Sequence, residues 1–117
     1  MATFTKFMLT GSTEGQGIDL VTSATPGTTL HTATNVASEM DEVWLYANNR
    51  TASQIDVTLE WGGTASGTLN FVGIPAQQGM VLITPGLTIS GGNVVAAFAS
   101  AVSGVSVFGF VNRINQA

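Results

Sequence analysis

The sequence predicts an all-β protein, an antiparallel β-sandwich of jelly-roll-like form with about eight to ten short strands. Apolar residues recur at every second position along much of the chain, and Thr, Val, Ser and Gly are abundant, which is typical of half-buried strands and their turns. Turn signals separate these segments at short intervals. Because 117 residues suffice for one core, we expect residues 1–117 to form a single β-sandwich domain.

The part of the chain before residue 40 predicts three strands, at residues 2–9, 17–22 and 28–34. The glycine-containing segment 11–17 predicts a surface loop, and Ala24-Thr25-Pro26-Gly27 predicts a turn. Residues 35–40 could form one short helical turn, and no longer helix is expected anywhere.

The strand that follows, Glu42–Ala47, is apolar on both faces. Trp44 and Tyr46 point one way, opposite an inner face of Val43, Leu45 and Ala47. Residues 48–52 come next and contain two asparagines, which tolerate the left-handed backbone at low cost. We therefore expect a β-hairpin that joins this strand to the next one.

The clearest strand signal lies in Gln54–Trp61, where apolar and polar side chains alternate over the whole segment. Asp56 and Glu60 share its polar face, but four residues of strand separate their Cα atoms by roughly 13 Å. Glycosidase carboxyl groups lie about 5 to 9.5 Å apart, so this pair does not indicate a glycosidase. We expect a solvated polar face here.

Five further strands are expected in the remaining sequence, at residues 68–74, 79–84, 87–90, 93–100 and 104–114. Proline and glycine pairs mark the turns between them, including Pro85-Gly86 and Gly91-Gly92. The last strand is again apolar on both faces, because Phe108 and Phe110 oppose Val105, Val107 and Val111.

Charge is scarce on this chain, with 9% charged residues where about 25% is usual. We infer that other protein covers much of the surface. A net charge of −4, with Lys6, Arg50 and Arg113 the only basic residues, argues against a nucleic-acid partner. No apolar stretch approaches the roughly 20 residues that span a bilayer, and residues 1–9 are a poor signal peptide, so we expect cytoplasmic synthesis and no membrane.

No catalytic residues, cofactor or metal are expected from the sequence. Cysteine is absent, and His31 is the only histidine, which favours a structural or surface role for its ring. Glu39, Asp41 and Glu42 form the densest acidic cluster. They could hold calcium, but their spacing matches no calcium loop, and a solvated acidic loop is the favoured interpretation.

The exposed faces of the two doubly apolar strands are the candidate interaction site. Trp44 and Tyr46 could form a sugar-stacking platform or fill a subunit interface, and the similar pattern at Phe108 and Phe110 favours burial between subunits or under a loop. Arg50, at the expected hairpin tip, and Arg113, near the C-terminus, are candidate polar contacts. A solvated charge is an equal alternative for each of these arginines.

Five motifs follow one another from residue 41 to residue 114: Asp41-Glu42-Val43-Trp44-Leu45-Tyr46-Ala47, Leu59-Glu60-Trp61-Gly62-Gly63-Thr64, Ile74-Pro75-Ala76 through Pro85-Gly86-Leu87, Ala96-Ala97-Phe98-Ala99 and Phe108-Gly109-Phe110-Val111-Asn112-Arg113-Ile114. Their order resembles that of small virion structural proteins of tailed bacteriophages, over roughly the last two-thirds of the chain. The first forty residues match no motif.

That resemblance implies a β-rich, non-enzymatic component of a virion made in the cytoplasm of a host bacterium. The role it favours is a capsid decoration or cement protein that binds the major capsid protein and itself forms a homo-oligomer, most simply a trimer. The alternatives are a tail, connector or fibre-base structural protein and, from another class, a carbohydrate-binding module of a phage tail or fibre.

Overall fold

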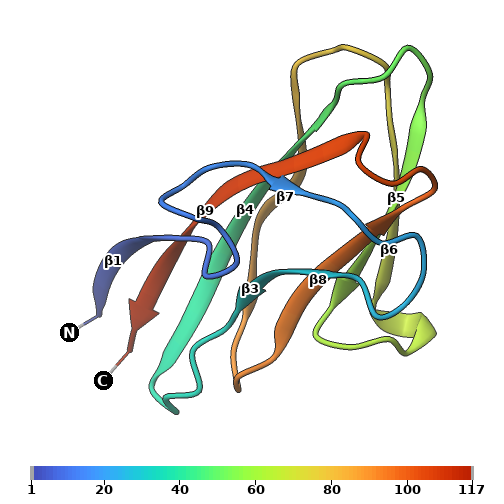
Figure 1. Cartoon of the computed structure of the whole chain (residues 1–117). Helices are drawn as coiled ribbons and strands as arrows, with labels where there is room; N and C mark the ends of the chain where they lie inside the picture. The colour runs from blue at the N-terminus through green and yellow to red at the C-terminus, as the bar shows by residue number, and fades with distance from the viewer. Residues whose placement is uncertain (1, 117) are drawn as a thin grey trace.

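A computed structural model describes residues 2–116, which form two antiparallel sheets packed face to face (Figure 1). The described residues hold nine strands and one 3-10 turn, which confirms the predicted all-β antiparallel sandwich. The elements are β1 (Thr3–Met8), β2 (Ile18–Asp19), β3 (Thr28–Thr32), β4 (Glu39–Asn49), β5 (Ile55–Trp61), η1 (Ser66–Thr68), β6 (Leu69–Ile74), β7 (Met80–Ile89), β8 (Val94–Ala99) and β9 (Val105–Asn115).

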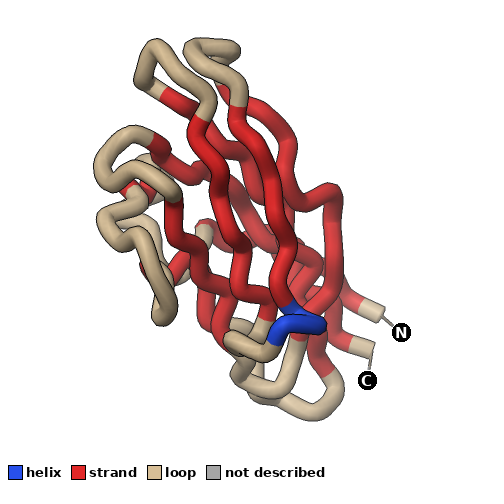
Figure 2. Tube along the Cα trace, turned by 90° about the vertical axis from the view of Figure 1, so that its right-hand side faces the viewer, coloured by secondary structure: helices blue, strands red, loops and turns tan. Residues whose placement is uncertain are grey.

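The strand order is that of a jelly roll. Sheet A has the order β1-β9-β4-β7, with β2 pairing beside β1 along the same edge of β9, and sheet B has the order β3-β8-β5-β6. A jelly roll has eight strand positions, numbered along the chain, that run 1-8-3-6 in one sheet and 2-7-4-5 in the other. The two sheets have this order when β1 and β2 together count as position 1 and β3 to β9 count as positions 2 to 8. The molecule is elongated, and both termini lie at one end of sheet A (Figure 2).

The core lies between the sheets and is built from the inward positions of the alternating strands. Every second residue of β4 and β9 faces its counterparts on β5 and β8, and nearly all of these side chains are inaccessible to solvent. The central members are Val43, Leu45, Ala47, Ile55, Val57, Leu59, Val95, Ala97, Ala99, Val105, Val107 and Val111.

The predicted hairpin between β4 and β5 is wrong, because the two strands lie in different sheets. Asn49 organises the crossing, and its side chain is fully buried. Its Nδ2 donates to the carbonyl oxygens of Ser53 and Ile74, and its Oδ1 accepts from the backbone and hydroxyl of Thr51. The asparagine is therefore required for its hydrogen bonds, and its φ is not in the left-handed region.

The predicted turn at Pro85-Gly86 is also wrong, and the two short strands expected on either side are one strand, β7. β7 is an edge strand of sheet A, where proline costs no ladder hydrogen bond. The register shifts beside Trp44, and Gly86 has a φ of 77° at this bulge. A Cβ on Gly86 would lie 2.9 Å from the Trp44 ring, so the bulge brings the backbone against the indole.

Two smaller differences concern the segments before β4. The expected helical turn at 35–40 is absent, because Glu39 already begins β4 after a turn closed by a hydrogen bond from its backbone N–H to the Val36 carbonyl. The strand expected at 17–22 shortens to Ile18–Asp19. Glu39, Asp41 and Glu42 are therefore strand residues, and the expected solvated acidic loop is wrong.

Candidate functional site

The outer face of sheet A brings the four predicted aromatic residues together. In the pairing of β4 with β9, Trp44 lies directly opposite Phe110, and Tyr46 opposite Phe108. The rings of Trp44 and Phe110 are stacked, with centroids 6.1 Å apart and an interplanar angle of 8°. All four side chains are partly exposed, and their strands bury the opposite face in the core. The two doubly apolar strands thus form one surface.

Apolar side chains continue this surface to both edges of the sheet. The register places Met8 of β1 beside Phe110, while Pro85 and Leu82 of β7 lie beside Trp44 and Tyr46. Met8 is 57% exposed and Leu82 is 46% exposed. We call this surface the apolar band, defined by Met8, Trp44, Tyr46, Leu82, Pro85, Phe108 and Phe110.

A row of polar side chains borders the band on the side nearer the chain termini. Glu42 accepts hydrogen bonds from the Trp44 Nε1 at 2.9 Å and from the Asn112 amide at 3.1 Å. These two bonds lower the pKa of the Glu42 carboxyl below its usual value. The Lys6 ammonium lies 4.5 Å from the centre of the Phe110 ring. Both charged groups of this row are therefore held against the aromatic rings.

A second group of polar side chains borders the apolar band on its opposite side, farther from the chain termini, and Arg50 belongs to it. Its guanidinium donates to the Ser106 hydroxyl, to the Ser103 carbonyl at 2.6 Å and to Asp19 at 3.1 Å. The expectation of a hairpin tip is wrong, because Arg50 follows β4 at the crossing to sheet B. Its charge is neutralised within the subunit, although 42% of the side chain remains exposed. A contact with a partner stays a prediction.

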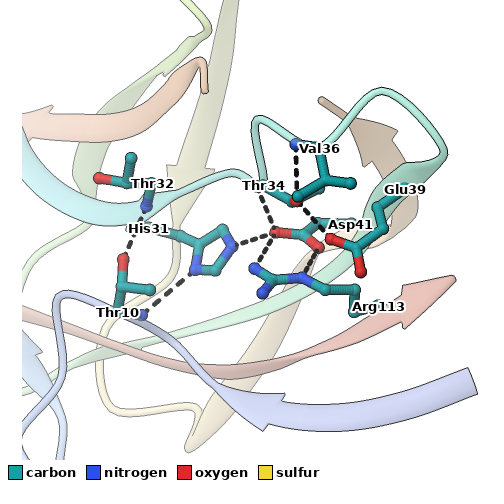
Figure 3. A network of polar contacts seen from close by, with 8 residues as sticks. All are labelled: Thr10, His31, Thr32, Thr34, Val36, Glu39, Asp41 and Arg113. Atoms are coloured by element: carbon teal, nitrogen blue, oxygen red, sulfur yellow. Dashed lines mark hydrogen bonds and ion pairs between the residues drawn. The ribbon is translucent and has the colours of Figure 1, made fainter. Parts of the chain in front are cut away.

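Arg113 is the centre of a second set of internal contacts (Figure 3). Its Nε and Nη2 donate to the two carboxylate oxygens of Asp41, at 2.8 and 3.0 Å. Its guanidinium carbon lies 4.7 Å from the centre of the Phe7 ring. Arg113 is therefore no free terminal charge, and its predicted role at an interface can involve only the 24% of the side chain that is exposed.

Asp41 joins Arg113 to a histidine on the opposite sheet. The Asp41 and His31 side chains are both fully buried, with His31 Nε2 lying 2.8 Å from Asp41 Oδ2 (Figure 3). The Thr10 backbone N–H donates to His31 Nδ1, so the ring proton is on Nε2 and points to Asp41. The Thr34 backbone N–H completes the set at 3.1 Å. These contacts tie β3 of sheet B to β4 and β9 of sheet A.

The electrostatics of this cluster follow from its hydrogen bonds. Burial raises the pKa of Asp41, but hydrogen bonds from Arg113, His31 and the Thr34 backbone, with the charge of Arg113, lower it below its usual value. The Asp41 hydrogen bond likewise raises the pKa of Arg113. Asp41 is therefore held ionised, and its negative charge is matched by the guanidinium.

The acidic cluster does not converge on a metal position. Alternation along β4 points Asp41 into the molecule and Glu42 onto the outer face, while Glu39 accepts a hydrogen bond from the Thr34 hydroxyl at 2.6 Å. Within residues 2–116, no group of three potential ligand side chains is placed to hold a metal ion. No helix in the same range is long and apolar enough to cross a bilayer.

No protein-family model, curated protein or solved structure gives a significant match to this chain. Its likeness to phage virion proteins is therefore a resemblance of motifs. Sequence reasoning had identified the aromatic residues of the band, but it missed the tie of Asp41 to His31 and Arg113. The alternation along β4 contained a signal for this tie, because Asp41 lies two residues before Val43 and four before Leu45 and therefore points to the same core side.

Proposed function

We propose that this protein is a non-enzymatic structural protein of a tailed-phage particle that decorates the capsid. In this proposal, the outer face of sheet A lies on the major capsid protein. The observation that carries the proposal is the apolar band, an aromatic-rich surface with polar side chains along both of its borders. An apolar centre with a polar rim is the usual organisation of a protein interface.

The face has the size that a specific interface needs. β4 and β9 are 11 residues long, so the sheet face is about 36 Å long and, across four strands, about 19 Å wide. The product is roughly 700 Å², close to the roughly 800 Å² that each partner contributes to a standard interface. One sheet face can therefore supply one complete contact.

The state of the charges also favours docking. Arg50 and Arg113 are ion-paired inside the subunit with Asp19 and Asp41, and none of the seven residues of the apolar band is Asp, Glu, Lys, Arg or His. Covering the band therefore removes water from few unmatched charges, namely those of Lys6 and Glu42 at its border. The free energy lost by desolvating ions is small there, and that gained by burying aromatic surface is large.

The jelly-roll order adds support by analogy, since viral capsid domains and lectins share it. As a homo-oligomer, most simply a trimer, the protein would place several bands on neighbouring capsid subunits. Each bound copy would stabilise the assembled shell by mass action, and linked bands would strengthen one another.

Co-sedimentation with shells that lack the protein tests the proposal. Leu82→Glu places a charge on an exposed position of the band, and Phe71→Glu is the matched control. Phe71 is 76% exposed and lies on β6 of sheet B. We expect Leu82→Glu to lose binding at least tenfold and Phe71→Glu to bind like the natural protein. Equal binding by all three proteins would refute docking through sheet A.

A carbohydrate-binding module of a tail or fibre is the second candidate. The parallel, partly exposed rings of Trp44 and Phe110 favour it, because sugars stack on such rings. The indole N–H already donates to Glu42, which leaves it unavailable to a sugar hydroxyl. Saturable binding on a glycan array that is lost in Trp44→Ala would favour carbohydrate binding over capsid decoration. Recovery of the protein only in the tail fraction of particles would indicate a tail, connector or fibre-base role.

A further inference from the structure

A hollow of about 350 Å³ lies on sheet B, remote in the fold from the apolar band. It opens where the loop before β3 meets the end of β5 and the start of β8. Four of its lining residues are glycines, so the wall is largely backbone. The lining is Pro26, Gly27, Thr29, Glu60, Gly62, Gly63, Thr64, Gly92, Asn93, Val94 and Ala96.

Glu60 is the only ionisable side chain in that lining. The sequence predicts it on a solvated polar face, but only 3% of it is exposed, because the loop before β3 covers it. One carboxylate oxygen accepts from the Thr25 hydroxyl and the other from the Gly27 backbone N–H. A carboxylate has about four acceptor sites, so these two bonds leave roughly half of them unused.

The described chain supplies Glu60 with no cation. Lys6, Arg50 and Arg113 are the only Lys and Arg residues of the sequence, and each contacts a partner in or beside sheet A. The only histidine, His31, is bonded to Asp41. Buried carboxylates in proteins are normally paired with a positive group, so the expected partner of Glu60 comes from outside the subunit.

We propose that this hollow binds an alkylguanidinium or alkylammonium group, with Glu60 as its counter-ion. The volume lies at the lower end of the range for ligand sites, about 300 to 1,000 Å³, and suits one such group with a short alkyl stem. Pro26, Val94 and Ala96 offer apolar surface to the stem. The same chemistry could come from an arginine or lysine of another protein or from a free small cation.

Propylguanidinium is the probe, and N-propylurea is its neutral counterpart of nearly the same shape. In ¹H–¹⁵N NMR titrations of the natural protein, we expect saturable shifts of the Gly27, Gly62 and Gly63 amide signals with propylguanidinium and none with N-propylurea. A blocked arginine tripeptide distinguishes the sources, since tighter binding than that of the probe indicates a protein side chain and weaker binding a free cation.

Two variants connect the response to the hollow. Glu60→Gln removes the charge and keeps the shape, and we expect it to weaken probe binding about tenfold, as loss of a charged hydrogen-bond acceptor does. Gly63→Leu adds a bulky side chain at the lining of the hollow without disturbing Glu60, because Gly63 is a lining residue and a Cβ there meets no atom within 4 Å. Gly67→Leu is its control, since Gly67 is equally open but lies outside the lining.

We expect Gly63→Leu to abolish the response and Gly67→Leu to preserve it. Absence of saturable shifts in the natural protein, equal shifts with N-propylurea, or an unchanged response in Gly63→Leu would each overturn the proposal. These outcomes are independent of decoration, because the hollow and the apolar band belong to different sheets and the probe titration involves no capsid.

Discussion

Replacing Asp41 by asparagine removes the one negative charge at the centre of the cross-sheet tie. Asp41 is fully buried and receives four hydrogen bonds, two of them from Arg113. An asparagine offers one oxygen, so its amide group must face a donor and leave that donor unpaired. Breaking a buried ion pair costs about 3 to 5 kcal/mol. Because 24% of the Arg113 side chain is exposed, we expect a value of about 3 kcal/mol, at the lower end.

That loss corresponds to a decrease in Tm of about 12 °C for a chain of this length. Circular dichroism during heating and urea titration measures it, with Asp56→Asn as the matched control. Asp56 is an exposed carboxylate on β5, and we expect its replacement to change stability by less than about 0.5 kcal/mol. A decrease below about 1 kcal/mol for Asp41→Asn would show that the tie contributes little and would refute this reasoning.

Three further predictions concern Asp41, Asn49 and the apolar band. Because the pKa of Asp41 is lower in the folded than in the unfolded protein, its contribution to stability is full above about pH 4 and is lost as the pH falls through the folded value. Urea titrations at several pH values should show this loss of stability in the natural protein and a smaller loss in Asp41→Asn. Asn49→Ala removes the buried side-chain hydrogen bonds to the Ile74 carbonyl and from the Thr51 N–H, so we expect about 2 kcal/mol of destabilisation by urea titration, and a loss below 0.5 kcal/mol would contradict the role of Asn49. Trp44→Ala and Phe110→Ala should weaken co-sedimentation with shells while circular dichroism shows the fold retained, and unchanged binding of both variants would place the capsid contact elsewhere.

Alternation was enough to predict which faces of β4, β5 and β9 enter the core. Ile55, Val57 and Leu59 do so on β5, as do the valines of β9. Alternation could not assign strands to sheets, because a period of two specifies a face and says nothing of the neighbouring strand. The path from β4 to β5 was for that reason mistaken for a hairpin.

The polar sites show a second limit of the sequence. Asp41 and Arg113 are 72 residues apart and meet only because β4 pairs with β9. Glu60 was correctly expected to point away from the core, yet it is buried by a loop more than thirty residues earlier in the chain. Contacts between distant segments decide both environments, and local patterns contain no record of them.

We propose above that the outer face of sheet A is the surface that meets the phage shell. A cryo-EM map of shells incubated with the purified protein tests this docking most directly. We predict density for a small oligomer on the shell, with Trp44, Tyr46 and Leu82 facing the major capsid protein. Density in which sheet A faces solvent, or shells that remain bare at saturating protein, would contradict the claim.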